Sequence, residues 1–244
     1  MTSDLSAQDP SLFREARARA AELQRRTGFL PAQDLLSLLL TEVFPGRIAL
    51  VSSFGSESAV LLHMVAEIDR ATPVIFLDTG RLFGETLRYR DALVRRLGLS
   101  DLRSVSPRPE DVAKEDGDSL LYRRAPERCC ALRKVEPLRR VLGGFEAWIT
   151  GRKGYQGGLR TGLPRVEADG PRLKINPLAN WQREGIEDYF LEHDLPRHPL
   201  EADGYLSIGC LTCTDRVALG EDRRAGRWRG LAKTECGIHL PGLH

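Results

Sequence analysis

Apolar residues in the first half of the chain alternate between strand-like and helix-like spacing. Apolar, β-branched runs at residues 48–52, 73–77 and 102–105 predict buried parallel strands. Apolar positions at helical spacing in residues 58–68 and 85–97 predict helices that pack on a sheet. Strands that alternate with helices in this way predict a doubly wound α/β fold with a mostly parallel sheet.

The same periodicities extend the prediction to both sides of this region. Further helices are expected at residues 11–26, 32–43, 127–142 and 184–193, and further strands at residues 147–150 and 173–175. Glycine and proline make residues 154–171 a predicted loop, and periodicity is lost after residue 199. We therefore expect one structural domain with three parts: an N-terminal helical segment (1–44), an α/β core (45–200) and a C-terminal segment (201–244).

Composition and charge narrow the possible partners. A 244-residue chain with 41% hydrophobic residues can bury a substantial core without disulfides. A formal charge of +2 gives no support to general binding of nucleic acid or of a membrane surface. The first residues contain no apolar signal core and no apolar stretch is long enough to span a bilayer, so we expect a cytoplasmic protein with reduced thiols.

The five cysteines fall into two close pairs and one single residue. Cys129 and Cys130 are adjacent, Cys210 and Cys213 form a CxxC pair roughly 80 residues later, and Cys236 stands alone near the C-terminus. Two pairs can place four thiolates around one metal centre, which leaves the fifth thiol for a substrate. Basic residues gather in sequence around these thiols and indicate a small anionic ligand. The pattern predicts a cofactor together with a nucleophile.

Spacing favours an iron–sulfur cluster over zinc at the paired cysteines. Four-cysteine zinc sites usually use two CxxC-type turns, because both thiolates of each pair must reach one ion. Adjacent side chains diverge, whereas the irons of a [4Fe–4S] cluster lie farther apart and accept ligands from a tandem pair. Four reduced thiols packed as small apolar groups are the alternative without a metal.

Three predicted strands end in segments suited to a ligand. Small residues including Ser53 and Gly55 precede a predicted helix, where free backbone N–H groups either receive an anion or are simply capped. Asp78 follows the second strand, where it hydrogen-bonds a ribose or caps the next helix, and residues 150–153 follow a later strand. In doubly wound sheets, ligands bind beyond such ends, where the strand order reverses.

Seven motifs occur in order along the chain: SFG followed by Glu57 (53–57), LDTGR (77–81), CCALRKVEPL (129–138), KINPL (174–178), GYLSIGCLTCT (204–214), RAGRW (224–228) and KTECGIH (233–239). With these motifs the chain resembles the assimilatory adenylylsulfate reductases, within a family that includes 3′-phosphoadenylylsulfate reductases and, more distantly, the adenine nucleotide alpha hydrolase-like proteins. Together the motifs span roughly residues 45 to 244, and the first cysteine motif and the last three motifs are the specific ones.

The resemblance implies a two-step reduction of an activated sulfate. Cys236 would attack the sulfur of adenylylsulfate and expel AMP, and thioredoxin or glutaredoxin would release sulfite from the resulting S-sulfocysteine. Lys134 would neutralise the sulfate near a [4Fe–4S] cluster on the four paired cysteines. By motif position, the substrate site comprises Ser53, Phe54, Gly55, Asp78, Lys134, Arg152, Arg224, Arg227 and His239. At i and i+3, the two later arginines would lie on one face if that stretch is helical.

One segment departs from the family pattern, and several readings stay open. Residues 153–160 read KGYQGGLR where the family commonly has an RDQS-like run. The 3′-phosphorylated nucleotide is the alternative substrate. A zinc-bound nucleotide-binding protein without redox chemistry and an ATP-dependent sulfurtransferase that carries a persulfide on Cys236 are more distant alternatives. Relatives are often oligomers, so a homo-oligomer is also possible.

Overall fold

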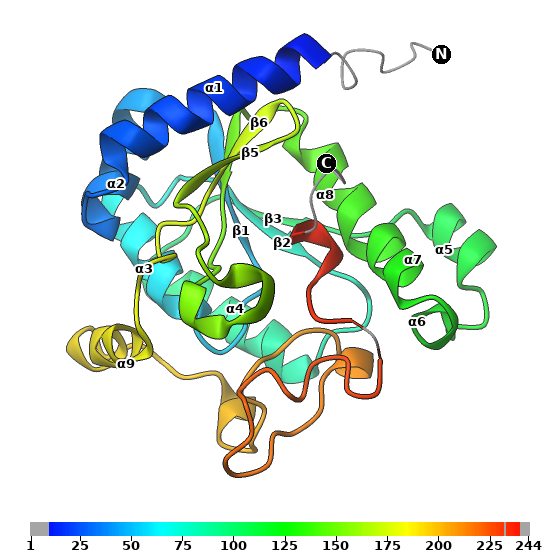
Figure 1. Ribbon diagram of the computed structural model, residues 1–244. Helices are drawn as coiled ribbons and strands as arrows, with labels where there is room; N and C mark the ends of the chain where they lie inside the picture. The colour runs from blue at the N-terminus through cyan, green and yellow to red at the C-terminus, as the bar shows by residue number, and fades with distance from the viewer. Residues whose placement is uncertain (1–9, 232, 240–244) are drawn as a thin grey trace.

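A six-stranded sheet forms the centre of the molecule in the computed structural model, which describes residues 10–231 and 233–239 (Figure 1). The strands are β1 (Ile48–Ser52), β2 (Val74–Leu77), β3 (Leu102–Val105), β4 (Ala147–Ile149), β5 (Val166–Asp169) and β6 (Arg172–Ile175). Their spatial order is β3-β2-β1-β4-β6-β5. All neighbouring pairs are parallel except β5 with β6, so the predicted doubly wound, mostly parallel sheet is confirmed.

The strand order reverses between β1 and β4. From β1 the chain adds β2 and then β3 on one side, and it returns to place β4 on the other side. Leu50 pairs with Val74 of β2 and also with Ile149 of β4, which fixes β1 in the middle of the parallel register. This reversal opens a crevice beyond the carboxyl ends of β1 and β4, which is the usual ligand position in such folds.

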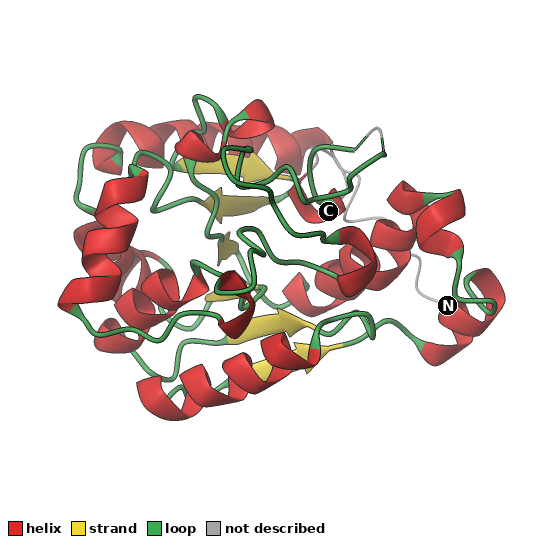
Figure 2. Ribbon diagram, turned by 90° about the horizontal axis from the view of Figure 1, so that it is seen from below, coloured by secondary structure: helices red, strands yellow, loops and turns green. Residues whose placement is uncertain are grey.

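Helices cover both faces of the sheet (Figure 2). They are α1 (Pro10–Thr27), α2 (Ala32–Leu38), α3 (Ser58–Ile68), α4 (Gly84–Leu97), α5 (Pro109–Glu115), α6 (Leu121–Arg124), α7 (Pro126–Cys130), α8 (Glu136–Leu142) and α9 (Arg183–Glu192). Side chains alternate between the two faces of each strand. Ile48 and Leu50 of β1 join the larger core with α2, α3, α4 and α9, whereas Ala49 and Val51 meet Leu138 of α8 in a second core.

The predicted helix over residues 127–142 contains a change of helical type. Helix α7 passes into a π-helical turn, Ala131–Val135, which continues directly into α8. A π-helical turn, Leu39–Val43, also extends α2. Such turns are rare and frequently occur at functional sites. The turn Ala131–Val135 contains Lys134, one of the predicted substrate residues.

The sequence prediction was wrong in one region of the sheet. Residues 154–171 were expected to be a loop, but they contain two 3₁₀ turns, Gly154–Gln156 and Gly158–Arg160, and the antiparallel edge strand β5. Strand β5 packs against α1. Within residues 10–231 and 233–239, no helix combines the length and the apolar character needed to cross a membrane.

After α9 the chain crosses the carboxyl end of the sheet in irregular structure. Only three short 3₁₀ turns occur in this part of the described chain: Pro199–Glu201, Leu211–Cys213 and Gly237–His239. An isolated antiparallel bridge pairs Cys210 with Leu82 near the end of β2. The last turn contacts α7 and the π-helical turn after it, which brings the described C-terminus over the crevice (Figure 1).

Candidate active site

A cavity of about 190 Å³ lies in this crevice, at the reversal of strand order. Its walls come from the ends of β1 and β4, the π-helical turn with Lys134 and the C-terminal segment. The cavity therefore brings together residues that are distant in the sequence. Of the predicted site residues, it is lined by Ser53, Gly55, Lys134, Arg152, Cys210, Arg224, Arg227, Cys236 and His239.

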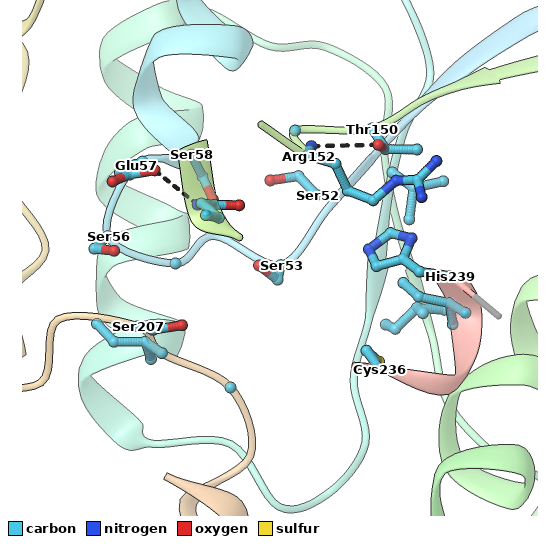
Figure 3. Close-up of a pocket in the computed structure, with 18 of the residues that line it drawn as sticks. Ser52, Ser53, Ser56, Glu57, Ser58, Thr150, Arg152, Ser207, Cys236 and His239 are labelled. Carbon is cyan, nitrogen blue, oxygen red and sulfur yellow. Dashed lines mark hydrogen bonds between the residues drawn. The ribbon is translucent and has the colours of Figure 1, made fainter. Parts of the chain in front are cut away.

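The turn after β1 presents small polar groups to the cavity. Phe54 has a positive φ of 49° and is fully buried, with its ring edge-on to Phe76 at 5.5 Å. Its backbone N–H donates to Ser52 Oγ at 3.2 Å. With this ring in the core, Ser53 and Gly55 face the cavity before α3 begins (Figure 3). Phe54 thus fixes the shape of the turn from the core, and its side chain does not line the cavity.

Asp78 likewise does not line the cavity. Its carboxylate accepts a hydrogen bond from the Gly80 N–H at 3.0 Å, in the turn that follows β2. Gly80 has a φ of +67°, a conformation that suits glycine. This bond stabilises the turn itself and does not cap the next helix, because α4 begins at Gly84 with Phe83 as its N-cap and no side-chain cap hydrogen bond.

The end of β4 contributes cationic groups held by buried partners. Arg152 donates through Nε to Asn176 Oδ1 at 3.2 Å and forms an ion pair with Glu167. The next residue, Lys153, lies 2.9 Å from the Glu57 carboxylate, and both side chains are buried. The segment that departs from the family pattern therefore closes the cavity wall with an ion pair to the turn after β1.

Cys236 lies against Lys134 on the opposite wall. The Lys134 Nζ is 3.7 Å from Cys236 Sγ. Gly237 permits the approach, because a Cβ there would meet Cys130 Cβ at 3.3 Å and Val135 Cγ2 at 3.2 Å. In Figure 3, Cys236 and His239 face the turn after β1 across the cavity.

The surroundings of Cys236 favour the thiolate. A hydrogen bond with Cys130 lowers its pKa, burial opposes this, and the charges of Lys134 and Arg227 lower it further, so the pKa lies well below the usual range. Burial alone would lower the pKa of Lys134, but the nearby thiols of Cys210 and Cys236 raise it above its usual value. A thiol whose pKa is lowered beside an ammonium is the arrangement expected for a nucleophilic cysteine.

Arg224 and Arg227 lie in a series of turns and not in a helix. They still reach the same cavity, because Trp228 gathers both guanidinium groups against its ring at 5.9 and 4.4 Å. Trp228 is buried and has a φ of 51°. Gly209 leaves room for the second arginine, since a Cβ there would lie 2.3 Å from Arg227 Nη2. Sequence analysis assigned no role to either Trp228 or Gly209.

His239 lies three residues beyond the nucleophile and also lines the cavity. Its ring is stacked on that of Trp148, with parallel planes (4°) and centroids 6.3 Å apart. Its backbone N–H donates to the Cys236 carbonyl at 2.9 Å. The histidine therefore anchors the last described turn to the sheet next to Cys236.

The four paired cysteines are drawn from neighbouring segments and are all free thiols. Burial raises the pKa of Cys129, and the nearby Cys210 and Cys213 raise it further against the charge of Arg133, so the second pair lies in the neighbourhood of Cys129. Thr79 Oγ1 lies 3.3 Å from Cys210 Sγ. Within the described ranges no set of three or more His, Cys, Asp or Glu side chains is gathered tightly around one point for a metal ion.

Several residues that sequence analysis missed meet beside Cys236. Arg160 donates to both oxygens of Glu235, from Nε at 2.6 Å and from Nη2 at 2.8 Å. Arg224 Nη2 lies 3.3 Å from the same carboxylate. Glu235 was quoted only within its motif, and Arg160 only within the divergent segment. A contact between residues 75 positions apart leaves no local pattern in the sequence. The position of Glu235 next to the nucleophile was the one signal that could have indicated its role.

These features define a doubly wound α/β protein with a thiol of lowered pKa in a cavity lined by cations at the strand-order reversal. The phosphoadenosine phosphosulfate reductase domain matches residues 47–216. The chain belongs to this family. The predicted family and fold class are therefore confirmed.

Individual relatives cover almost the whole chain. The adenosine 5′-phosphosulfate reductase of Chelativorans sp. (strain BNC1) is 51% identical over 230 residues, which cover 94% of each chain. The enzyme of the same name from Mesorhizobium japonicum is 52% identical over 226 residues, covering 93% of this chain and 89% of its own. The crystal structure of the phosphoadenylyl-sulfate reductase of Candida auris, a phosphate complex, has a TM-score of 0.67 and 28% identity, covering 80% of this chain and 96% of its own.

Proposed function

We propose that this protein reduces adenylylsulfate to sulfite and AMP through an S-sulfocysteine on Cys236. One observation carries the proposal: the Cys236 thiol lies 3.7 Å from Lys134 Nζ in a cavity that also contains Arg152, Arg224 and Arg227. A thiolate surrounded by cations suits attack on a sulfur atom within an anionic group. The relatives named above support adenylylsulfate as the substrate.

In the first step, the Cys236 thiolate attacks the sulfur of the substrate. A sulfur–sulfur bond forms, the bond between that sulfur and the phosphate oxygen breaks, and AMP leaves with the electron pair. Negative charge grows on the departing phosphate, where Arg224 and Arg227 are placed to bind it. Lys134 stabilises the thiolate beforehand and faces the sulfate oxygens during transfer.

In the second step, an external dithiol supplies two electrons. One thiolate of thioredoxin or glutaredoxin attacks Cys236 Sγ, sulfite leaves with the electron pair, and a mixed disulfide forms. The second thiol of the reductant resolves this disulfide, which frees Cys236 and oxidises the reductant. Cys236 is half-buried, so the reductant requires the C-terminal segment to move outward from the cavity.

The nucleotide belongs at the opposite wall, over the turn after β1. Ser53 and Gly55 line this wall just before α3 begins at Ser58 (Figure 3). Backbone N–H groups at the start of a helix and the helix dipole favour a phosphate there. With the phosphate between this turn and the arginines, the sulfate points toward Cys236.

We infer that the four paired cysteines hold a [4Fe–4S] cluster. Their donor set fits, since Cys129, Cys130, Cys210 and Cys213 are free thiols and Cys129 lies in the neighbourhood of the second pair. When bound, the cluster supplies a fixed charge and a rigid floor next to Lys134. Both electrons of the reaction come from thiols. Iron and acid-labile sulfide at four each per chain in anaerobically purified protein test this assignment, and stoichiometric zinc without iron would contradict it.

The decisive experiment measures anaerobic sulfite release with thioredoxin present. Wild-type protein should release sulfite from adenylylsulfate, and Cys236→Ser should release none while retaining its iron. The 3′-phosphorylated nucleotide is assayed in parallel, because the likeness to the Candida auris enzyme favours it as the second candidate substrate. A clear preference for the 3′-phosphate would replace adenylylsulfate, and no sulfite from either nucleotide would refute both.

A further inference from the structure

The carboxylate of Glu235 lies among the cations of the cavity, directly before the nucleophile. It is buried, it accepts two hydrogen bonds from Arg160, and it lies 3.3 Å from Arg224 Nη2. The backbone N–H of Cys236 donates to Glu235 Oε1 at 2.8 Å. One carboxylate thus connects two segments of the cavity wall to the residue that carries out the chemistry.

This carboxylate is ionised, so it offsets part of the positive charge of the two arginines. Burial raises the pKa of Glu235, but the hydrogen bond and charge of Arg160 and the charge of Arg224 outweigh burial and lower it to about 2. Arg160 and Arg224 both line the cavity. In the absence of substrate, one of their two positive charges is thus balanced by a group of the protein itself.

An incoming anion still finds one unsatisfied donor. The buried Arg227 Nε makes no hydrogen bond within the described part of the chain. Its guanidinium is held against Trp228 at 4.4 Å and lines the same cavity. This unsatisfied buried donor lies beside Arg160 and Arg224, which already pair with Glu235. The arrangement points to an anionic ligand that binds Arg227 first.

We propose that Glu235 is an internal substitute for the anionic group of the substrate and holds the Cys236 segment closed until that group displaces it. The inference rests on the proposed function. A phosphosulfate group carries more negative charge than one carboxylate and offers more acceptor oxygens to the guanidinium groups. Because Glu235 and Cys236 are consecutive, exchange of the carboxylate for substrate must shift the backbone N–H and the thiol. Glu235 is thereby a positioning residue that couples substrate binding to the placement of the nucleophile.

The first test measures how accessible Cys236 is. Iodoacetamide labelling of the Cys236 peptide is followed by mass spectrometry at pH 8.5, where a thiol with a depressed pKa is ionised in all variants. Glu235→Gln should label about fivefold faster than wild type, the low end of typical coupling between sites. Glu235→Asp keeps the charge and should label slowly. Glu221→Gln is the matched control, because Glu221 pairs with Arg229 on the surface.

The second test measures substrate affinity by calorimetry in a Cys236→Ser background, which prevents turnover. Adding Glu235→Gln removes the competing charge and should tighten adenylylsulfate binding about fivefold, whereas adding Glu221→Gln should not. Binding no tighter than in the Cys236→Ser parent, or labelling no faster than in Glu221→Gln, overturns the inference. Failure of the proposed function has a separate signature, which is the absence of sulfite from wild-type protein whatever the labelling rates.

Discussion

The ammonium of Lys134 lies 3.7 Å from the thiol of Cys236, although the two residues are 102 positions apart. Lys134 belongs to a π-helical turn, and Cys236 immediately precedes the last described 3₁₀ turn. The contact exists because Gly237 leaves space for the segment to press against Cys130. The pairing gives the thiol its charge partner and gives the cavity a cation at the point of sulfur transfer.

Replacement of Lys134 by methionine should separate charge from packing. We expect kcat/KM to fall about 100-fold or more, as for loss of a single positioned group that stabilises developing charge. The pKa of Cys236 should rise, because Lys134 lowers it. The pH profile of Cys236 alkylation should therefore shift toward higher pH. The exposed Lys114 provides the control Lys114→Met. A variant with an intact cluster and full turnover would refute this role.

The substitution Gly209→Ala should weaken substrate binding with little effect on stability. The added Cβ would lie 2.3 Å from Arg227 Nη2, so the guanidinium must leave its place against Trp228. The far end of an arginine moves easily, and the free energy of unfolding should change by less than about 1 kcal/mol. KM should rise about tenfold, as for loss of one hydrogen bond to a charged group.

Gly144→Ala is the matched control, because a Cβ there meets nothing within 4 Å. Steady-state kinetics and urea unfolding of both variants separate the two effects. An unchanged KM in Gly209→Ala would show that Arg227 does not contact the substrate. A large loss of stability would place the strain in the backbone instead.

Local pattern predicted the elements whose residues are buried in regular alternation. Strand β1 and helix α3 begin and end where the sequence places them, because apolar runs and helical spacing are unambiguous there. Strand β5 was missed because it is a short edge strand with mixed burial in a glycine-rich stretch, and its partner β6 decides its structure. Helix α5 was also missed, because this short polar helix buries no side chain and has no apolar stripe.

The candidate site was predicted through chemistry more than through position. Motif residues such as Lys134 and Cys236 do meet, whereas Phe54 and Asp78 are not among the residues that line the cavity. The motifs that contain Phe54 and Asp78 specify the backbone shape of a turn. Such a turn requires particular side chains for packing as well as for binding. Arg160 depends on an ion pair across 75 residues, and no local pattern announces such a partner.

The buried His198 should make the stability of the fold depend on pH. Its Nδ1 accepts from the Leu200 N–H at 3.2 Å, Nε2 lies 3.1 Å from Thr86 Oγ1, and burial lowers its pKa to about 4. In the unfolded chain, the pKa of His198 is near 6.5. The contribution of the neutral histidine to the free energy of unfolding is therefore complete above about pH 6.5. It is lost as the pH falls toward 4, by up to about 3 kcal/mol.

The variant His198→Asn tests this contribution, since its side-chain oxygen can still accept from the Leu200 N–H. Its free energy of unfolding in urea should depend less on pH between 7 and 5 than that of wild type. The comparison is made at several pH values on the same cluster-containing preparation. Parallel curves for the two proteins would show that His198 is not protonated on unfolding.

The buried pair of Lys153 and Glu57 should be more costly to break than to replace. Lys153→Met leaves the Glu57 carboxylate without its closest cation, and Gln156 Nε2 at 3.1 Å is then a main partner. Loss of one member of a buried pair typically costs about 3–5 kcal/mol, whereas replacement of both is often nearly neutral. We therefore expect Lys153→Met to be strongly destabilised and Glu57→Gln/Lys153→Met to recover most of the loss.

A double-mutant cycle in urea measures this coupling, with Lys114→Met as the exposed control. The cycle bears on the segment in which this chain departs from its family. A large coupling energy means that Lys153 stabilises the turn after β1. A residue of the divergent segment then has a structural role at the cavity wall. KM for adenylylsulfate should then rise in Lys153→Met and return toward the wild-type value in the double variant. If stability recovers but KM does not, Lys153 or Glu57, which both line the cavity, contacts the nucleotide itself, because packing alone would restore both.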